Sequence, residues 1–252
     1  DVGAICNDTA YALAHAHCGR MKEQLMQLND RLTGSRFLRG VNCVGGVALD
    51  LSGLQLAQVE VELNTLEQDF SAIEKIVFAN ASLTERLENT GILTEGIAWD
   101  HAVIGVVGRA SGIDRDLRRD RPFAAYDVLQ PKVALYRYGD VRARMRVRLD
   151  EIHESIRLIR EVRRGLPLGR LVSRPMHEAQ PGVWALSAVE GWRGEILYVV
   201  MAGDADRIHR CKVRDPSFVN WPAIQWAALG NIVPDFPLIN KSFNLSYAGN
   251  DL

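Results

Sequence analysis

The apolar pattern of residues 50–80 constrains the fold most. Large apolar residues recur at seven-residue intervals, with others at the alternate positions between them: Leu56, Val59, Leu63, Leu66, Phe70, Ile73 and Val77. An a/d heptad pattern of this length predicts one long helix whose apolar seam faces another helix. A fold built on this chain must therefore supply a second long helix beside it.

Two further long helices are expected. Residues 1–34 keep apolar residues at three- and four-residue spacing and end at a glycine, which predicts a single helix. Residues 138–164 keep helical spacing throughout. Shorter helices are predicted at residues 82–87 with Ser82 as cap, at 94–107, within 215–230 after Pro222, and at 235–243.

The pattern changes to strands in the last third of the chain. Alternating apolar residues predict strands at 183–189, 195–202 and 208–213, joined by glycine-bearing turns. An irregular linker with Pro167, Pro175 and Pro181 precedes them, and Asn42 to Gly46 predicts a turn.

The expected fold class is α+β, mainly α. We expect a single domain over residues 1–252, with a long-helix bundle at 1–165, a small antiparallel sheet at 183–213, and C-terminal helices and a tail at 214–252. The chain starts at Asp1, without Met and inside a helical pattern, so we expect a C-terminal fragment of a longer protein.

Charge and cysteine content exclude several classes of function. The net charge of −1 gives no global basic field for nucleic acid. Arginine supplies 25 of the 30 basic residues, which favours buried or intersubunit ion pairs. The four cysteines form no Cys-x-x-Cys pair and fit a reducing compartment. No apolar run is long enough for a transmembrane helix, and no signal peptide opens the chain.

Two clusters of polar residues invite a binding interpretation that their spacing does not favour. His15, His17 and Cys18 suggest a metal site, but positions two apart on a helix do not face each other, so packing or exposure is expected. The alternating arginines of residues 142–148 fall around a helix rather than along one stripe, which argues against nucleic-acid binding. No dinucleotide-binding, phosphate-loop, serine-hydrolase or zinc-protease motif is present.

One charge-dense stretch, Gly105 to Asp127, stands out between the helical patterns. It carries five arginines and four aspartates, and glycines and Pro122 interrupt it, so no regular element is expected to run through it. Two interpretations are open: an ordered segment at a cleft between packed helices, or a solvated surface loop with compensating charges.

The stretch and its surroundings also carry recognisable segments. Within it stand Arg109-Ala110-Ser111-Gly112, Asp116-Leu117-Arg118, Pro122-Phe123 and Tyr126-Asp127. Outside it stand Asp1-Val2-Gly3-Ala4, Gly45-Gly46-Val47, Gly139-Asp140-Val141, Arg148 through Glu151, Glu190-Gly191-Trp192-Arg193-Gly194-Glu195 and Pro216-Ser217-Phe218-Val219-Asn220. Together they resemble the hydrogenase-like large subunit of respiratory complex I and of membrane-bound nickel–iron hydrogenases. Within that family the chain looks most similar to the formate hydrogenlyase and hydrogenase-4 large subunits.

The resemblance also shows where the chain departs from the family. Catalytic hydrogenases of the family end their core with Asp-Pro-Cys-x-x-Cys, whose thiolates bind the nickel–iron centre. Ser246 and Gly249 occupy those cysteine positions here, and neither supplies a thiolate. Trp192 replaces a proline beside the metal pocket. The resemblance therefore implies a cavity without a nickel–iron centre.

The remaining implication is a complex I-like role. The resemblance implies an electron-transfer subunit of a membrane-associated, NADH dehydrogenase-like or formate hydrogenlyase-like oxidoreductase, with NAD binding and quinone binding in the assembly. It also implies an iron–sulfur cluster in a partner small subunit, no cofactor in this chain, and a cytoplasmic place peripheral to the inner membrane. The candidate residues on the cavity or quinone side are Asp1, Arg109, Arg118, Glu190 and Arg193.

Other interpretations remain open. The chain could be a non-catalytic scaffold, or a hydrogenase with altered metal ligation, and each arginine could serve only in a structural ion pair. We expect no enzymatic activity from the isolated chain, since the resemblance places its electron donor in another subunit.

Overall fold

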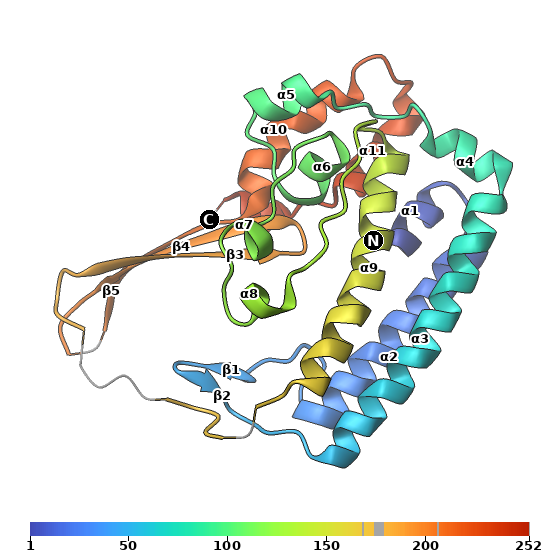
Figure 1. The fold of residues 1–252 in the computed structure, drawn as a ribbon. Helices are drawn as coiled ribbons and strands as arrows, with labels where there is room; N and C mark the ends of the chain where they lie inside the picture. Colours follow the sequence, from blue (N-terminus) through green and yellow to red (C-terminus); the bar gives the residue numbers. More distant parts are fainter. Residues whose placement is uncertain (168, 174–178, 206, 252) are drawn as a thin grey trace.

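A computed structural model describes residues 1–167, 169–173, 179–205 and 207–251. Three long helices dominate it: α2 (Ala12–Thr33), α3 (Gly53–Ala79) and α9 (Val141–Arg164) (Figure 1). Helix α3 packs against both α2 and α9, and its heptad positions Leu63, Phe70 and Val77 are buried. The predicted long helix and its helical partner are therefore confirmed.

The prediction of one helix over residues 1–34 is wrong. The segment forms α1 (Val2–Asp8) and α2, which fold back on each other around Ala10, whose φ of 59° is left-handed. Thr9 helps to end α1 by donating its hydroxyl to the carbonyl of Cys6 at 2.9 Å. The fold-back lets Ile5 and Cys6 reach the core. The predicted end at Gly34 is confirmed by its left-handed cap.

The prediction of one helix over residues 94–107 is also wrong. Thr94 caps α5 (Glu95–Asp100), but the chain then breaks before α6 (Gly105–Ala110). At the break, the Asn220 side chain accepts a hydrogen bond from Ile104 N–H at 3.0 Å and donates to the Ile104 carbonyl at 3.1 Å. A buried amide from α10 (Pro216–Ala228) thus replaces the helical hydrogen bonds of Ile104.

The other predicted short helices are present, but they begin at other residues than predicted. Helix α4 (Ala81–Leu87) is capped by Asn80 rather than Ser82, and α10 begins at Pro216 and runs through Pro222. Helix α11 (Phe236–Phe243) follows the 3-10 turn η1 (Val233–Asp235). The remaining helices are α7 (Leu117–Asp120), α8 (Tyr126–Leu129) and α12 (Tyr247–Asn250).

The predicted antiparallel sheet is confirmed. Strands β3 (Trp184–Gly191), β4 (Gly194–Ala202) and β5 (Ile208–Arg214) pair in the order β3-β4-β5. The sheet extends away from the helices, and β3 and β4 contact α6, α7 and α10 near the β3–β4 turn (Figure 1). The predicted turn at residues 42–46 closes a small hairpin of β1 (Asn42–Cys43) and β2 (Gly46–Val47).

The predicted linker is irregular wherever the structure describes it. Leu171 and Ser173 form backbone hydrogen bonds with the β1–β2 hairpin, while Pro175 lies outside the described residues. Among the described residues, no helix has the length and apolar content needed to cross a bilayer.

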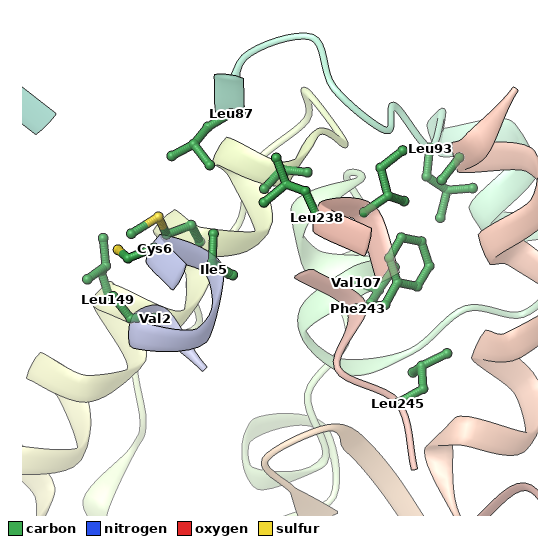
Figure 2. Close-up of a cluster of buried hydrophobic side chains, with 14 of the residues drawn as sticks. Val2, Ile5, Cys6, Leu87, Leu93, Val107, Leu149, Leu238, Phe243 and Leu245 are labelled. Carbon is green, nitrogen blue, oxygen red and sulfur yellow. The ribbon is translucent and has the colours of Figure 1, made fainter. Parts of the chain in front are cut away.

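One hydrophobic core joins elements from both ends of the chain. Ile5 and Cys6 of α1 lie with Leu149 of α9, and Leu238 and Phe243 of α11 belong to the same cluster (Figure 2). Because α1 contacts both α9 and α11, the first and last helical segments share one interior. This packing brings Asp1, the β3–β4 turn and the tail after α11 close together. The mainly α, α+β class is confirmed.

Candidate functional site

The charge-dense stretch is half buried, so neither interpretation describes all of it. Every residue of α6 is buried, and so are Asp116 and Leu117. The part from Arg119 to Pro122 is exposed. Helix α6 packs on α9, and α7 contacts β3, so the buried half lies between the long helix and the sheet.

Arg109 is the centre of a buried ionic cluster formed by Arg109, Asp116, Arg118, Glu151 and Glu190, which we call the Arg109 cluster. Arg109 is 1% exposed. Its Nη1 donates to Glu190 Oε1 at 3.0 Å, and its Nη2 donates to Glu151 Oε1 at 2.5 Å. These partners come from β3 and α9, so one guanidinium group joins three elements.

Asp116 and Arg118 form the second half of the cluster. Arg118 donates to both carboxylate oxygens of Asp116, at 2.9 and 2.6 Å, and Arg109 Nη1 lies 3.5 Å from Asp116 Oδ2. Burial raises the pKa of Asp116, but hydrogen bonding to Arg118 and the charges of both arginines outweigh it, so the net pKa is lowered. Asp116 also caps α7 by accepting from the Arg118 N–H.

The pKa of Glu190 is shifted in the opposite direction to that of Asp116. Burial raises its pKa, and the nearby charge of Asp116 adds to that effect, while Arg109 opposes it; the net pKa is raised. The Arg109 guanidinium is destabilised by burial, yet Glu151, Glu190 and Asp116 raise its pKa overall. The cluster therefore contains one firmly ionised carboxylate, Asp116, and one carboxylate with increased proton affinity, Glu190.

Asp1 belongs to a separate pair. Its Oδ2 lies 3.1 Å from Nη1 of Arg148, and its Oδ1 accepts a hydrogen bond from Asn244 Nδ2 at 2.6 Å. Arg148 also donates to the carbonyl of Ser242 at 2.8 Å, and burial lowers the pKa of its guanidinium. These contacts tie the first residue to α9 and to the tail after α11.

Arg193 lies at the tip of the β3–β4 turn. Its Nε donates to the Asn244 carbonyl at 2.6 Å, and its guanidinium stacks 3.9 Å from the ring centroid of Trp192. Arg193 is thus held by a carbonyl and a ring, whereas Arg109 and Arg118 are held by carboxylates. Arg109 and Arg118 therefore form ion pairs with nearby acidic residues, and Arg193 is held differently.

A cavity of ≈ 400 Å³ lies beside these groups. Its apolar lining comes from four elements and includes Val2, Met21, Leu25, Leu66, Phe70 and Ile152. Its polar or aromatic lining includes Asp1, Lys22, Arg148, Glu151, Ser155 and Trp192. Of the five predicted site residues, Asp1 lines this cavity directly. Arg109 connects Glu190 to it through Glu151, Arg118 lies 3.8 Å from Glu151, and Arg193 follows the lining residue Trp192.

Ser246 and Gly249, which stand where the family's hydrogenases have cysteines, serve the local fold in this chain. Ser246 Oγ caps α12 by accepting from the Gly249 N–H at 2.9 Å. A Cβ atom at Gly249 would lie 2.6 Å from Cγ of Asp215, so the site leaves no room for a larger residue without movement. These residues do not fit a thiolate-bound metal centre. Among the described residues, no group of three or more His, Cys, Asp or Glu is placed to hold a metal ion.

Comparison with known proteins identifies the family. Residues 8–183 and 177–251 match the family described as respiratory-chain NADH dehydrogenase, 49 Kd subunit. The chain belongs to this family. The resemblance inferred from its segments is thereby confirmed.

Individual relatives agree with this assignment. Formate hydrogenlyase subunit 5 of Escherichia coli (strain K12) is 29% identical over 251 residues, covering 100% of this chain and 44% of that protein. Hydrogenase-4 component G of the same strain is 28% identical, covering 100% of this chain and 42% of that protein. An NADH-quinone oxidoreductase subunit of Clostridium beijerinckii is 30% identical over 226 residues, covering 89% and 61%. The chain thus spans between 42% and 61% of the length of these relatives.

Two residues of the cavity wall were not among the candidates predicted from the sequence. Glu151 and Arg148 lie three residues apart on α9, one helical turn, and both line the cavity. Their spacing was visible, but a charged pair on a long helix ordinarily faces solvent. Only the packing of α1 and the β3–β4 turn over this face of α9 shows that they point inward.

Proposed function

We propose that this chain is part of the large subunit of a membrane-associated, complex I-like or formate hydrogenlyase-like oxidoreductase, and that its cavity receives a quinone headgroup. Electrons would come from an iron–sulfur cluster in a partner small subunit. The chain itself would hold no nickel–iron centre. Family membership and the names of the relatives support the class of assembly, and the whole-protein activity is part of the proposal because the chain covers only part of each relative.

The observation that carries the quinone proposal is the composition of the cavity. Most of its wall is apolar; the pair of Asp1 and Arg148, 3.1 Å apart, and Glu151, one turn further along α9, add charged groups, and Trp192 adds an aromatic ring. An apolar body with a polar carbonyl end matches such a site, because a cavity of this kind binds through apolar contact and is oriented by a few polar groups. The ring of Trp192 offers a stacking surface for a flat headgroup.

A cavity-filling substitution tests the proposal. Ile152→Trp would occupy the cavity from α9 without changing charge. In the intact complex we expect the KM for a short-chain quinone to rise at least about tenfold, since losing 1.4 kcal/mol of binding gives that factor. The matched control is Ile159→Trp, seven residues further along the same helix, where the side chain is 43% exposed and outside the cavity. Equal kinetics for both variants would reject quinone binding here.

A scaffold role is the alternative that one observation favours. The acidic groups of the cavity wall are paired within the chain, Asp1 with Arg148 and Glu151 with Arg109. A cavity whose charges only hold helices together would tolerate filling. If Ile152→Trp assembles normally and leaves electron transfer by the complex unchanged, the scaffold function is favoured.

Metal content tests the remaining part of the proposal. We expect no stoichiometric nickel in the purified full-length protein, because Ser246 and Gly249 supply no thiolate. Elemental analysis of the intact complex, with iron as an internal reference for the partner's cluster, measures this. Nickel at one atom per large subunit, together with hydrogen uptake, would support altered metal ligation instead.

A further inference from the structure

The Arg109 cluster carries a surplus negative charge. The carboxylates of Asp116, Glu151 and Glu190 face the guanidinium groups of Arg109 and Arg118. Two neighbouring arginines pair outside the five members: Arg115 pairs through its side chain with Glu195, and Arg148 pairs with Asp1 although its charge also acts on Glu151. Asp116 and Glu190 are almost fully buried, whereas Glu151 is 18% exposed, and burial favours uptake of a proton by the buried carboxylate that has fewer charged donors.

Geometry identifies where that proton resides. Asp116 is held by both nitrogens of the Arg118 fork, so its two oxygens are occupied by charged donors. Glu190 is 3% exposed, accepts one charged hydrogen bond from Arg109, and uses its other oxygen only for the Leu117 N–H at 3.2 Å. Of the two almost fully buried carboxylates, Glu190 therefore has fewer charged donors than Asp116. The raised pKa of Glu190 and the lowered pKa of Asp116 agree with this assignment.

Glu151 connects the cluster to the cavity. It is 18% exposed, and it is the cluster member that also lines the cavity. Glu151 and Glu190 occupy the two terminal nitrogens of the same Arg109 guanidinium. The Arg109 guanidinium itself stays protonated, so a proton passing from Glu190 to Glu151 moves around it through an intervening water molecule.

We propose that Glu151 donates a proton to the acceptor in the cavity, that Glu190 resupplies it, and that Arg109 positions both carboxylates. This inference rests on the proposed quinone site. Reduction of a quinone to a quinol takes two electrons, from the partner's iron–sulfur cluster, and two protons. One comes from Glu190 by way of Glu151: the Glu190 O–H bond breaks as Glu151 gains the proton, and the new Glu151 O–H bond breaks as a quinone oxygen gains it, so that Glu151 ends ionised. Glu190 is then reprotonated from solvent, and the second proton of the quinol also comes from solvent.

The donor role is tested in the intact complex by Glu151→Gln. We expect quinone turnover to fall about 100-fold with little change in KM, as loss of a general acid typically does. Glu151→Asp should recover part of the rate. The control is Glu161→Gln on the same helix, whose carboxylate is 45% exposed and pairs with Arg157, and it should leave turnover unchanged. Full turnover in Glu151→Gln would overturn the proposal.

The role of Glu190 is tested by pH and by infrared spectroscopy. Glu190 must be protonated to supply the proton, so turnover should fall as pH rises through its raised pKa. Glu190→Gln removes that group, so this fall should be absent. Independently of turnover, the infrared band of a carboxyl group that stays protonated above the ordinary range of glutamic acid should be lost in Glu190→Gln and kept in Glu195→Gln.

The outcomes separate this proposal from the proposed function. If Ile152→Trp leaves quinone reduction unchanged, the quinone site itself is wrong. If Ile152→Trp weakens quinone binding but Glu151→Gln keeps full turnover, only the donor role is wrong. If the carboxyl band persists in Glu190→Gln, the proton is not stored on Glu190 and the proposal is overturned.

Discussion

At the scale of single residues, Arg144 shows how the chain uses buried arginine for structure. It is 0% exposed and donates to Ser242 Oγ at 2.8 Å, the Gly139 carbonyl at 2.6 Å and the Gly91 carbonyl at 2.9 Å. Arg144→Met would remove the donor to the Gly91 carbonyl and one of the two donors to the Gly139 carbonyl, so we expect a loss of about 1–3 kcal/mol in the free energy of unfolding. Urea denaturation of the full-length protein measures it. Arg142→Met, at a 40% exposed pair with Glu88, should cost less than about 1 kcal/mol.

Asp116 gives a prediction with a defined pH dependence. Its pKa is lower in the folded protein than the ordinary value of 3.8, so its contribution to stability is present above that pH and is lost as pH falls through the folded pKa. Asp116→Asn should lower the free energy of unfolding at pH 7 by about 3–5 kcal/mol and flatten its acid dependence. The control Asp114→Asn, at a 54% exposed aspartate, should keep both the free energy of unfolding at pH 7 and its acid dependence. If the free energy of unfolding of Asp116→Asn still falls at acid pH as steeply as that of the unchanged protein, the lowered pKa of Asp116 is not the cause of the acid dependence.

Residue types could be predicted from the sequence better than residue partners. The excess of arginine over lysine correctly indicated internal ion pairs, and Arg109 and Arg118 form them. The partners Glu151 and Glu190 lie 42 and 81 residues away from Arg109, and no local pattern specifies contacts at such separations. Arg193 shows the limit most clearly, because its main partner is a backbone carbonyl, which carries no sequence signal.

At the scale of elements, the contact between α6 and the β3–β4 turn holds the site together. Gly105 has a φ of +68°, and a Cβ atom there would lie 2.0 Å from the Arg193 carbonyl oxygen. Gly105→Ala should therefore displace the turn and cost at least about 2 kcal/mol, from the left-handed conformation and the clash together. In α5, a Cβ atom added at Gly96 would meet no atom within 4 Å beyond the backbone of its own helix and its chain neighbours. Gly96→Ala should therefore stabilise the protein by about 0.5–1 kcal/mol. Thermal unfolding of both variants measures the contrast.

Element prediction succeeded where local periodicity decided the structure and failed where distant groups did. The heptad pattern correctly predicted α3, and alternation correctly predicted the sheet. The breaks near Ala10 and Ile104 were missed, since one depends on packing of α1 against the core and the other on Asn220 from α10. A helical pattern continues through both points, so the tertiary contacts override it.

At the scale of the whole molecule, stability should be unevenly distributed. The core joins α1, α3, α9, α10 and α11, whereas Trp184, Leu186 and Ile208 at the far end of the sheet are each about 60% exposed. Amides of α9 should therefore exchange with solvent only by global unfolding, and those of the far half of the sheet by local opening. If residues 1–252 form a single domain, as predicted, the amides of all its long helices should exchange together as one unit.

Hydrogen exchange followed by mass spectrometry on the full-length protein tests this gradient. Met145→Ala, at a fully buried position of α9, should lower the free energy of unfolding by about 2–5 kcal/mol and speed exchange throughout α1, α9 and α11. Exchange at residues 184–187 and 208–211 should be unaffected, since local opening there does not expose the core. Two results would contradict the argument: protection of the far sheet equal to that of α9, or faster exchange in α9 without any change in α1.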